Sequence, residues 1–326
     1  MTVFPVEYTT LSSKALLDTV IEAYAFPEAT SICFIKRGFN DTYLISTDKT
    51  DFILRVYKYN YRSSESIETE IKLLLHLHKN NVSVSYPIAD SKNHYIQTIN
   101  APEGKRYAVL FTYAKGEVIR KLSIEQSFLL GIDCAKIHKL TCNLSLGTCA
   151  QDYELNSQFS KTLTVLKPIL HKFPEELNIL TKLQDDFLRI FNSPDTSTLS
   201  KGICHGDLQA ENFHITSSDQ FTFFDFDFFG KGYLAYDIGV FRWYDHKNKT
   251  TEIMNSFLRG YRTIKELNAI EIALIPYFGV LRALFQMTLI CEQHNGSRLP
   301  LWKPQQVAEF IRKTNQWYIN NCKPII

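Results

Sequence analysis

The sequence predicts an α+β protein of two lobes, in which a small antiparallel sheet with one helix precedes a larger, mainly helical part. The chain has 326 residues and 45% of them are apolar, whereas single hydrophobic cores stop growing near about 250 to 300 residues. Three strand-like runs lie between residues 31 and 57, and the pattern after residue 113 is almost entirely helical. We therefore predict one lobe at residues 1–113 and a second at residues 114–326.

The first lobe begins with a short helix and a series of β-hairpins. The helix is expected around residues 13–24, and turn-forming residues at 37–41 and 47–50 divide the following stretch into three strands. The third strand contains one charged residue, Arg55. Two-residue alternation places Arg55 on the same face as Tyr57, within a strand that is otherwise apolar on both faces.

An amphipathic helix and two more strands complete the first lobe. Residues 63–65 form a helix cap, after which apolar residues recur at spacings of three and four. Glu70 borders the apolar stripe of this helix on one side and Glu68 borders it on the other, so helical geometry separates the two only weakly. Further strands are expected at residues 94–98 and 106–111.

Helical periodicity dominates the second lobe, with one short β segment between residues 202 and 230. Within that segment, a turn at residues 217–220 predicts a hairpin, and antiparallel pairing then places Asn212 opposite Asp225. Helices are predicted at residues 124–140, 156–171, 175–191, 251–264, 270–294 and 304–321.

Composition argues against several classes of partner. Lys and Arg number 36 against 34 for Asp and Glu, so no strong field draws nucleic acid or an anionic membrane to the surface. The seven cysteines are scattered and never form C-x-x-C, which argues against a disulfide framework or a zinc site. No leader pattern and no run near the roughly 18 apolar residues of a membrane span are recognised. We expect a soluble cytoplasmic protein with no nucleic-acid and no membrane partner.

The residues that carry chemistry lie between positions 205 and 225. Asp207 and Asn212 are five residues apart in a glycine-containing loop, and Asp225 follows the hairpin. An amide oxygen beside carboxylates makes a hard oxygen site suited to Mg²⁺, which is usually held by few protein oxygens together with nucleotide phosphates. Each residue alone is more simply explained as a turn cap or a strand end, but their joint spacing favours the metal site.

The motif H-G-D-x-x-x-x-N at residues 205–212, followed by F-D-F-D at 224–227, resembles the catalytic and metal-binding loops of the aminoglycoside phosphotransferase and choline kinase superfamily. It is also similar to the H-R-D-x-x-x-x-N and D-F-G segments of protein kinases. The resemblance implies a bilobal protein-kinase-like fold with the active cleft between the lobes, and a phosphotransferase that uses ATP and Mg²⁺. It implies that Asp207 accepts the proton of the attacking hydroxyl, that Asn212 and Asp225 hold Mg²⁺, and that His205 braces the loop.

The sequence Y-D-I-G at residues 236–239 resembles the corresponding segment in one branch of that superfamily, which contains the bacterial stress-response kinase and spore-coat proteins. This resemblance implies that Asp237 is a buried residue that braces the catalytic loop. Arg55 stands where kinases place the lysine that contacts the α- and β-phosphates and pairs with a helix glutamate, for which the family spacing favours Glu70. A purely structural Arg55–Glu70 pair is the alternative. The remaining nucleotide contacts that the resemblance implies are a phosphate-covering loop at Gly38 and adenine contacts at Phe111 and Tyr113.

Three functions are compatible with these residues. The first is a kinase for a small hydroxylated molecule, such as an amino alcohol, a hydroxy amino acid or an aminoglycoside. The second is a serine/threonine protein kinase with a protein acceptor, and the third is a non-catalytic nucleotide-binding protein. Aromatic residues between 228 and 244 either form a cage for an amine by cation–π attraction or pack helices. The role of Asp227 and the choice between ATP and GTP stay open.

Overall fold

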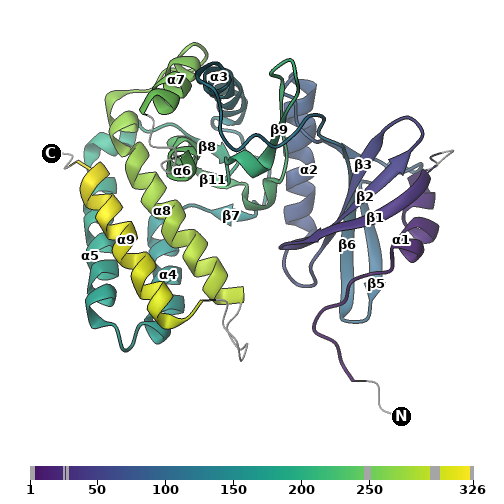
Figure 1. Cartoon of the computed structure of the whole chain (residues 1–326), viewed down its shortest axis with the longest axis horizontal. Coiled ribbons are helices and arrows are strands. Elements are labelled where there is room, and N and C mark those ends of the chain that lie inside the picture. Colours follow the sequence, from purple (N-terminus) through teal and green to yellow (C-terminus); the bar gives the residue numbers. More distant parts are fainter. Residues whose placement is uncertain (1–3, 25, 27–28, 246–250, 294–301, 324–326) are drawn as a thin grey trace. The chain divides into compact units, whose positions relative to one another are not determined.

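The computed structural model describes residues 4–24, 26, 29–245, 251–293 and 302–323, and the chain forms two compact units (Figure 1). Unit 1 comprises residues 1–119, 145–150 and 213–224, and the remaining residues form unit 2. The hairpin after Asn212 therefore packs with unit 1, although it lies far along the sequence. The assignment of nucleotide binding to residues 1–113 and of catalysis to residues 114–326 stays a prediction.

Unit 1 is built on an antiparallel sheet with the strand order β1-β2-β3-β6-β4, in which β5 also pairs with β6. The three strands expected between residues 31 and 57 and the two expected later are confirmed, whereas the two-residue strand β4 was not predicted. Leu54 and Val56 of β3 are buried with residues of the first helix, including Leu16. The strands are Ala29–Arg37 (β1), Asn40–Thr47 (β2), Asp51–Tyr57 (β3), Pro87–Ile88 (β4), Ile96–Ala101 (β5) and Gly104–Thr112 (β6), and the helices are Ser13–Thr19 (α1) and Ser64–Lys79 (α2).

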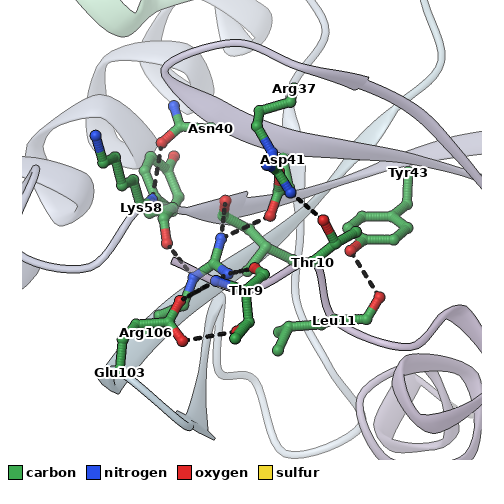
Figure 2. Close-up of polar contacts among 12 residues, drawn as sticks. Thr9, Thr10, Leu11, Arg37, Asn40, Asp41, Tyr43, Lys58, Glu103 and Arg106 are labelled. Atoms are coloured by element: carbon green, nitrogen blue, oxygen red, sulfur yellow. Dashed lines mark hydrogen bonds and ion pairs between the residues drawn. The ribbon is translucent and has the colours of Figure 1, made fainter. Parts of the chain in front are cut away.

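A buried arginine ties the strands of this sheet together (Figure 2). Arg106 is 1% exposed and donates hydrogen bonds to Asp41 on β2 at 2.9 Å, to the Tyr57 carbonyl on β3 at 2.9 Å and to the Thr9 carbonyl at 3.0 Å. Because a buried charge is stable only when it is paired and hydrogen-bonded, these contacts hold the turn end of the β1–β2 hairpin, β3 and the N-terminal segment together.

Unit 2 is mainly helical. Helices α4, α5, α8 and α9 pack against one another, and α3 packs along α7 (Figure 1). The six predicted helices are all present, although His294, the predicted end of one, lies outside the described residues. Helix α6 was not predicted. The bounds are Ile124–Thr141 (α3), Leu155–Ile169 (α4), Pro174–Phe191 (α5), Ala235–Asp245 (α6), Thr251–Arg262 (α7), Ala269–Gln293 (α8) and Pro304–Asn321 (α9).

Helix α8 corrects the expectation that no segment is long and apolar enough to cross a membrane. An 18-residue window within residues 269–292 has a mean hydropathy of 1.6, so this helix passes that test by length and composition. However, 89% of the window is buried inside the protein, which is equally typical of the central helix of a globular core. The length of this helix is therefore only weak support for a membrane span.

A three-stranded sheet in unit 2 holds both ends of the segment with the candidate chemistry. Strand β11 (Gly230–Tyr233) lies between β7 (Gln151–Asp152) and β8 (Lys201–Cys204), with Gly230 opposite Cys204. Strand β8 leads directly into the loop of Asp207, and β11 begins after the turn that follows Asp225. A Cβ on Gly230 would lie 2.4 Å from the Gln151 carbonyl oxygen, so the close approach of these strands requires glycine there.

Candidate active site

The loop of Asp207 depends on a glycine in the left-handed backbone region. Gly206 has φ +85°, and a Cβ at this position would lie 2.0 Å from the Phe228 carbonyl oxygen and 2.2 Å from the Tyr153 hydroxyl. That hydroxyl also donates to the Phe228 carbonyl. The chain therefore turns sharply at Gly206, with the neighbouring loop packed directly against it.

Asp237, at the start of α6, braces this loop through hydrogen bonds. Its carboxylate is 1% exposed and accepts hydrogen bonds from the backbone N–H groups of His205 at 2.7 Å and Gly206 at 2.8 Å. It also lies 3.0 Å from Nε2 of His138, whose Nδ1 is 2.8 Å from the Tyr261 hydroxyl. Burial alone would raise the pKa of Asp237, but the hydrogen bond and charge of His138 and the loop N–H groups outweigh burial and hold that pKa below its ordinary value. The brace implied by the resemblance is confirmed.

The Asp207 carboxylate is held by side chains. The residue is 6% exposed, and its Oδ1 accepts a hydrogen bond from Nη2 of Arg282 at 2.6 Å, while Oδ2 accepts one from Gln209 at 3.0 Å. The Asp207 N–H group donates to Nδ1 of His205 at 3.3 Å, so His205 contributes to the loop conformation as expected.

The sequence analysis missed Arg282. This residue is 3% exposed and is the one basic residue of α8, a helix that is otherwise strongly apolar. Because charged residues are almost never fully buried without a partner, an arginine in the middle of such a helix was a signal that a carboxylate lies nearby. No pattern in the sequence indicates that this carboxylate is Asp207, which is 75 positions away.

Asn212 and Asp225 suit a small hard cation. The Asn212 amide nitrogen donates to the Asp207 carbonyl oxygen at 2.8 Å, and the amide oxygen is the atom of this side chain that can bind a cation. Asp225 has left-handed backbone angles, φ 63° and ψ 56°, and begins the turn Phe226–Phe228. The ring of Phe226 lies 4.2 Å from that of His205, so the turn packs on the catalytic loop. Among the described residues, no group of three or more His, Cys, Asp or Glu forms a protein-only metal cage. A two-oxygen site fits a Mg²⁺ ion that keeps phosphate and water ligands.

The hairpin register differs by one residue from the expectation. Phe213 pairs with Phe223, so continuing the register places Asn212 opposite Phe224, and Asp225 lies one residue beyond. The two candidate ligands still begin and end the hairpin, but they are not a directly opposed pair. The difference arises because the exact length of the turn, and hence the register, is set by backbone geometry that residue types only approximate.

Unit 1 contains the predicted ion pair between Arg55 and Glu70. Nη1 of Arg55 is 3.3 Å from Oε1 of Glu70, and Glu70 is 1% exposed, whereas Glu68 faces solvent. The other oxygen of Glu70 accepts hydrogen bonds from Arg62 at 2.5 Å and from the Tyr57 hydroxyl at 3.1 Å. The contact of Arg62 with Glu70 was not predicted. The predicted pair of Arg55 and Glu70 is confirmed, while the contact of Arg55 with a nucleotide stays a prediction.

The other three predicted nucleotide residues are placed less specifically. Gly38 lies at the tip between β1 and β2, where a Cβ would meet nothing closer than 4.0 Å, so the turn itself does not require glycine. Phe111 pairs with Ile53 within the sheet, and its ring lies 5.4 Å from the Arg55 guanidinium. Tyr113 follows β6 and its side chain is partly exposed. The roles of Gly38, Phe111 and Tyr113 stay predictions.

A kinase-like fold with this braced loop defines an ATP-dependent phosphotransferase that acts on hydroxyl groups. Comparison with known families agrees: residues 31–270 match the profile of the phosphotransferase enzyme family. Because the match covers well over half of the chain, the protein belongs to that family.

Related sequences extend over most of the chain. An uncharacterized protein of Synechocystis sp. (strain ATCC 27184 / PCC 6803 / Kazusa) is 35% identical over 270 residues, covering 82% of this chain and 75% of that protein. A homoserine kinase of Rhodopseudomonas palustris (strain TIE-1) is 23% identical over 318 residues, covering 94% of this chain and 92% of the relative.

Two solved structures share the fold. A microcompartment-associated aminopropanol kinase superimposes with a TM-score of 0.78 at 22% identity, covering 95% of this chain and 99% of the other. The amicoumacin kinase hAmiN, solved in complex with AMP-PNP, Ca²⁺ and Ami, gives a TM-score of 0.77 at 20% identity, covering 97% and 96%. The predicted bilobal kinase-like fold class is therefore confirmed.

Proposed function

We propose that this protein is a Mg²⁺-dependent kinase that transfers the γ-phosphoryl group of ATP to a hydroxyl of a small molecule, with Asp207 as the catalytic carboxylate. The observation that carries the proposal is the loop of Asp207, which is fixed by Asp237 through two backbone hydrogen bonds, while the Asp207 carboxylate accepts hydrogen bonds from the side chains of Arg282 and Gln209. Such an arrangement positions one carboxylate rigidly enough to orient an attacking hydroxyl.

The transfer needs one proton acceptor and one leaving group. The acceptor oxygen attacks the γ-phosphorus, its proton passes to the Asp207 carboxylate, and the bond to the β-phosphate oxygen breaks so that ADP leaves with the bonding electrons. Asn212 and Asp225 supply the oxygen ligands for the metal. Mg²⁺, when bound there, would neutralise charge on the phosphate oxygens. His205 and Asp237 hold the loop in place throughout, so little reorganisation is required during the reaction.

The Arg55–Glu70 pair supports nucleotide binding in unit 1. Glu70 is held by Arg62 and Tyr57 as well, so its carboxylate fixes the position of the Arg55 guanidinium. An arginine can grip phosphate through two parallel hydrogen bonds, although it does not reproduce the geometry of lysine. We propose that Arg55 contacts the nucleotide phosphates and that Glu70 orients it.

The acceptor class is proposed from the relatives. The relatives include a homoserine kinase, an amicoumacin kinase and an aminopropanol kinase, all with small-molecule acceptors, so we favour an amino alcohol, a hydroxy amino acid or an aminoglycoside. The alternative of a protein acceptor finds no support among these relatives. A non-catalytic protein, which arginine at position 55 suggested, does not agree with membership of an enzyme family.

The test is Mg²⁺-dependent ATP turnover across these acceptor classes by the wild type and by Asp207→Asn. We expect Asp207→Asn to lower kcat by about 10²- to 10⁴-fold while the dissociation constant for nucleotide changes less than about threefold, because the carboxylate acts in the transition state. Asp133→Asn, which changes a partly exposed residue of α3 that pairs with Lys136, is the matched control. Turnover that survives in Asp207→Asn would reject the assigned role, and nucleotide binding without turnover on any acceptor would favour the non-catalytic alternative.

A further inference from the structure

Arg282 has more hydrogen-bond donors than the described protein uses. The guanidinium carries five N–H donors, of which Nη2 serves Asp207 at 2.6 Å and the Tyr244 hydroxyl at 3.1 Å. Nε and Nη1 are buried and have no hydrogen-bond partner among the described residues. Because buried donors are nearly always satisfied, donors left over next to a catalytic carboxylate call for an oxygen atom that is supplied by something else.

The aromatic surroundings of Arg282 show what charge this place accepts. The guanidinium carbon lies 5.4 Å from the ring centre of Phe228, 5.8 Å from that of Tyr244 and 5.6 Å from that of Phe285. These distances are within the range of cation–π contacts. Two of the residues that suggested a cage for an amine, Phe228 and Tyr244, therefore already surround a cation of the protein itself. An amine placed there would meet a like charge, whereas an anion would be attracted.

Arg282 is charged and keeps hydrogen-bond donors for a further anion. Burial by itself lowers the pKa of Arg282. The Asp207 carboxylate and the surrounding tyrosines raise this pKa by more than burial lowers it, so the guanidinium stays charged. A carboxylate is the ligand group that matches a guanidinium best, since its two oxygens accept charge-assisted hydrogen bonds. Residue 282 lies outside the family match at 31–270, so membership of the family does not by itself assign a role to this arginine.

We propose that Arg282 binds a carboxylate of the acceptor, so that the substrates are hydroxy acids, including hydroxy amino acids. The inference rests on the proposed kinase function of the same site. Of the three acceptor classes proposed above, it favours the hydroxy amino acids over the amino alcohols and the aminoglycosides. The acceptor carboxylate and the Asp207 carboxylate would contact the same guanidinium. Binding would therefore place the acceptor hydroxyl beside Asp207. The acceptor carboxylate would share the positive charge of Arg282 with the Asp207 carboxylate.

The first test compares acceptors that differ only in the carboxylate. L-Homoserine, L-serine and 4-hydroxybutanoate are each assayed beside their primary amides, with 1-amino-2-propanol as a cationic acceptor. We expect kcat/KM for the preferred acid to exceed that for its amide by about 30- to 100-fold, the usual effect of one charged hydrogen-bonded pair. Equal or higher kcat/KM for the amides or for 1-amino-2-propanol would overturn the proposal and leave the kinase function intact. This arm needs no variant and does not depend on a variant folding.

The second test asks whether Arg282 is responsible. In Arg282→Gln, the ratio of acid to amide should fall to within about threefold of unity, and in Arg282→Lys it should be partly retained. Arg242→Gln, which removes a partly buried arginine of α6 bonded to Asn321, should keep the wild-type ratio. A loss of turnover that is equal for acid and amide would show that Arg282 only positions Asp207. An unchanged ratio with a raised KM for ATP would show that the oxyanion is a nucleotide phosphate. Either result overturns the proposal.

A binding measurement separates this inference from the kinase function. Calorimetric titration of the preferred acid and its amide into the wild type with AMP-PNP and Mg²⁺ requires no turnover. Acid binding that is lost in Arg282→Gln, in a protein without turnover, would support the carboxylate site and reject the kinase. Turnover of acceptors without carboxylates, together with no binding of the acid, would support the kinase function and reject the carboxylate site. No binding of any acid and no turnover of any acceptor would overturn both.

Discussion

Asp237→Asn isolates the contribution of the brace beneath the catalytic loop. Asp237 Oδ2 accepts hydrogen bonds from the His205 N–H group and from His138, and Oδ1 accepts one from the Gly206 N–H group. Asparagine keeps one of these oxygens and replaces the other by an NH₂ group. Whichever way the amide turns, a donor of the side chain faces a donor of the protein in a site that is 1% exposed.

The magnitude follows from counting these groups. A hydrogen bond to a charged group contributes about 1.5 to 3 kcal/mol, and a buried donor left without a partner costs about 1 to 3 kcal/mol. At least one bond is lost and one donor is left unsatisfied, so we expect a loss of about 3 to 5 kcal/mol in the free energy of unfolding, similar to breaking a buried ion pair. The control Asp133→Asn, in a partly exposed pair, should cost less than about 1 kcal/mol.

Two measurements check this expectation. Urea unfolding gives the change in stability, and hydrogen exchange read by mass spectrometry on peptides that contain residues 205 and 206 reports the two braced N–H groups directly. Exchange there should accelerate in Asp237→Asn and stay at the wild-type rate in Asp133→Asn. A stability change below about 1 kcal/mol, together with unchanged exchange at residues 205 and 206, would refute the reasoning, because the carboxylate would then not be holding the loop.

Three further predictions follow from other contacts. Arg106→Met should lower the free energy of unfolding by about 3 to 5 kcal/mol, because the buried Asp41 carboxylate loses its 2.9 Å ion pair and keeps the more distant, exposed Arg37 at 3.5 Å. The double variant with Asp41→Leu should recover part of this loss in urea unfolding. Gly206→Ala should cost at least about 3 kcal/mol through its positive φ and the backbone contact a Cβ would make, whereas Gly38→Ala should change unfolding by less than about 0.5 kcal/mol; equal effects of the two would contradict the geometry. A carboxyl whose pKa is lowered by folding stabilises the protein above its unfolded value of about 3.9 and loses that contribution as pH falls through the folded value. Since the pKa of Asp237 is lowered, the stability of the wild type should decline more steeply below about pH 4 than that of Asp237→Asn in acid titrations of unfolding.

The regular elements were predictable where the sequence repeats a local pattern. Helices such as α3, α5 and α9 alternate apolar and polar residues with helical spacing, and the three strands after residue 29 are separated by turn-forming residues. Helix α6 lacks such a signal because seven of its eleven residues are buried, so an apolar stripe cannot be distinguished from its other faces. Strands of two to four residues, such as β4 and β7, are too short for any periodicity to be read.

The site was predictable only as far as its residues are close in sequence. Asp207, Asn212 and Asp225 lie within one segment, and a motif at fixed spacing identifies them. The partners that set their environment come from elsewhere: Arg282 is 75 positions from Asp207 and Asp237 is 31 positions from Gly206. Such pairings depend on how helices pack on the loop, which residue types alone do not specify. A lone cation within an apolar stretch is the exception, because its burial requires a partner that can be searched for.

The two buried carboxylates of this loop show how environment separates structure from chemistry. Asp237 accepts hydrogen bonds from two backbone N–H groups and from His138, donors that are fixed by the fold, so protonating it would break several bonds at once and its pKa is lowered. The Asp207 carboxylate accepts hydrogen bonds from the side chains of Arg282 and Gln209. In the proposed reaction this carboxylate accepts the proton of the acceptor hydroxyl, whereas the hydrogen bonds of Asp237 go to the loop and to His138. The difference in partners therefore favours a catalytic role for Asp207 and a structural role for Asp237.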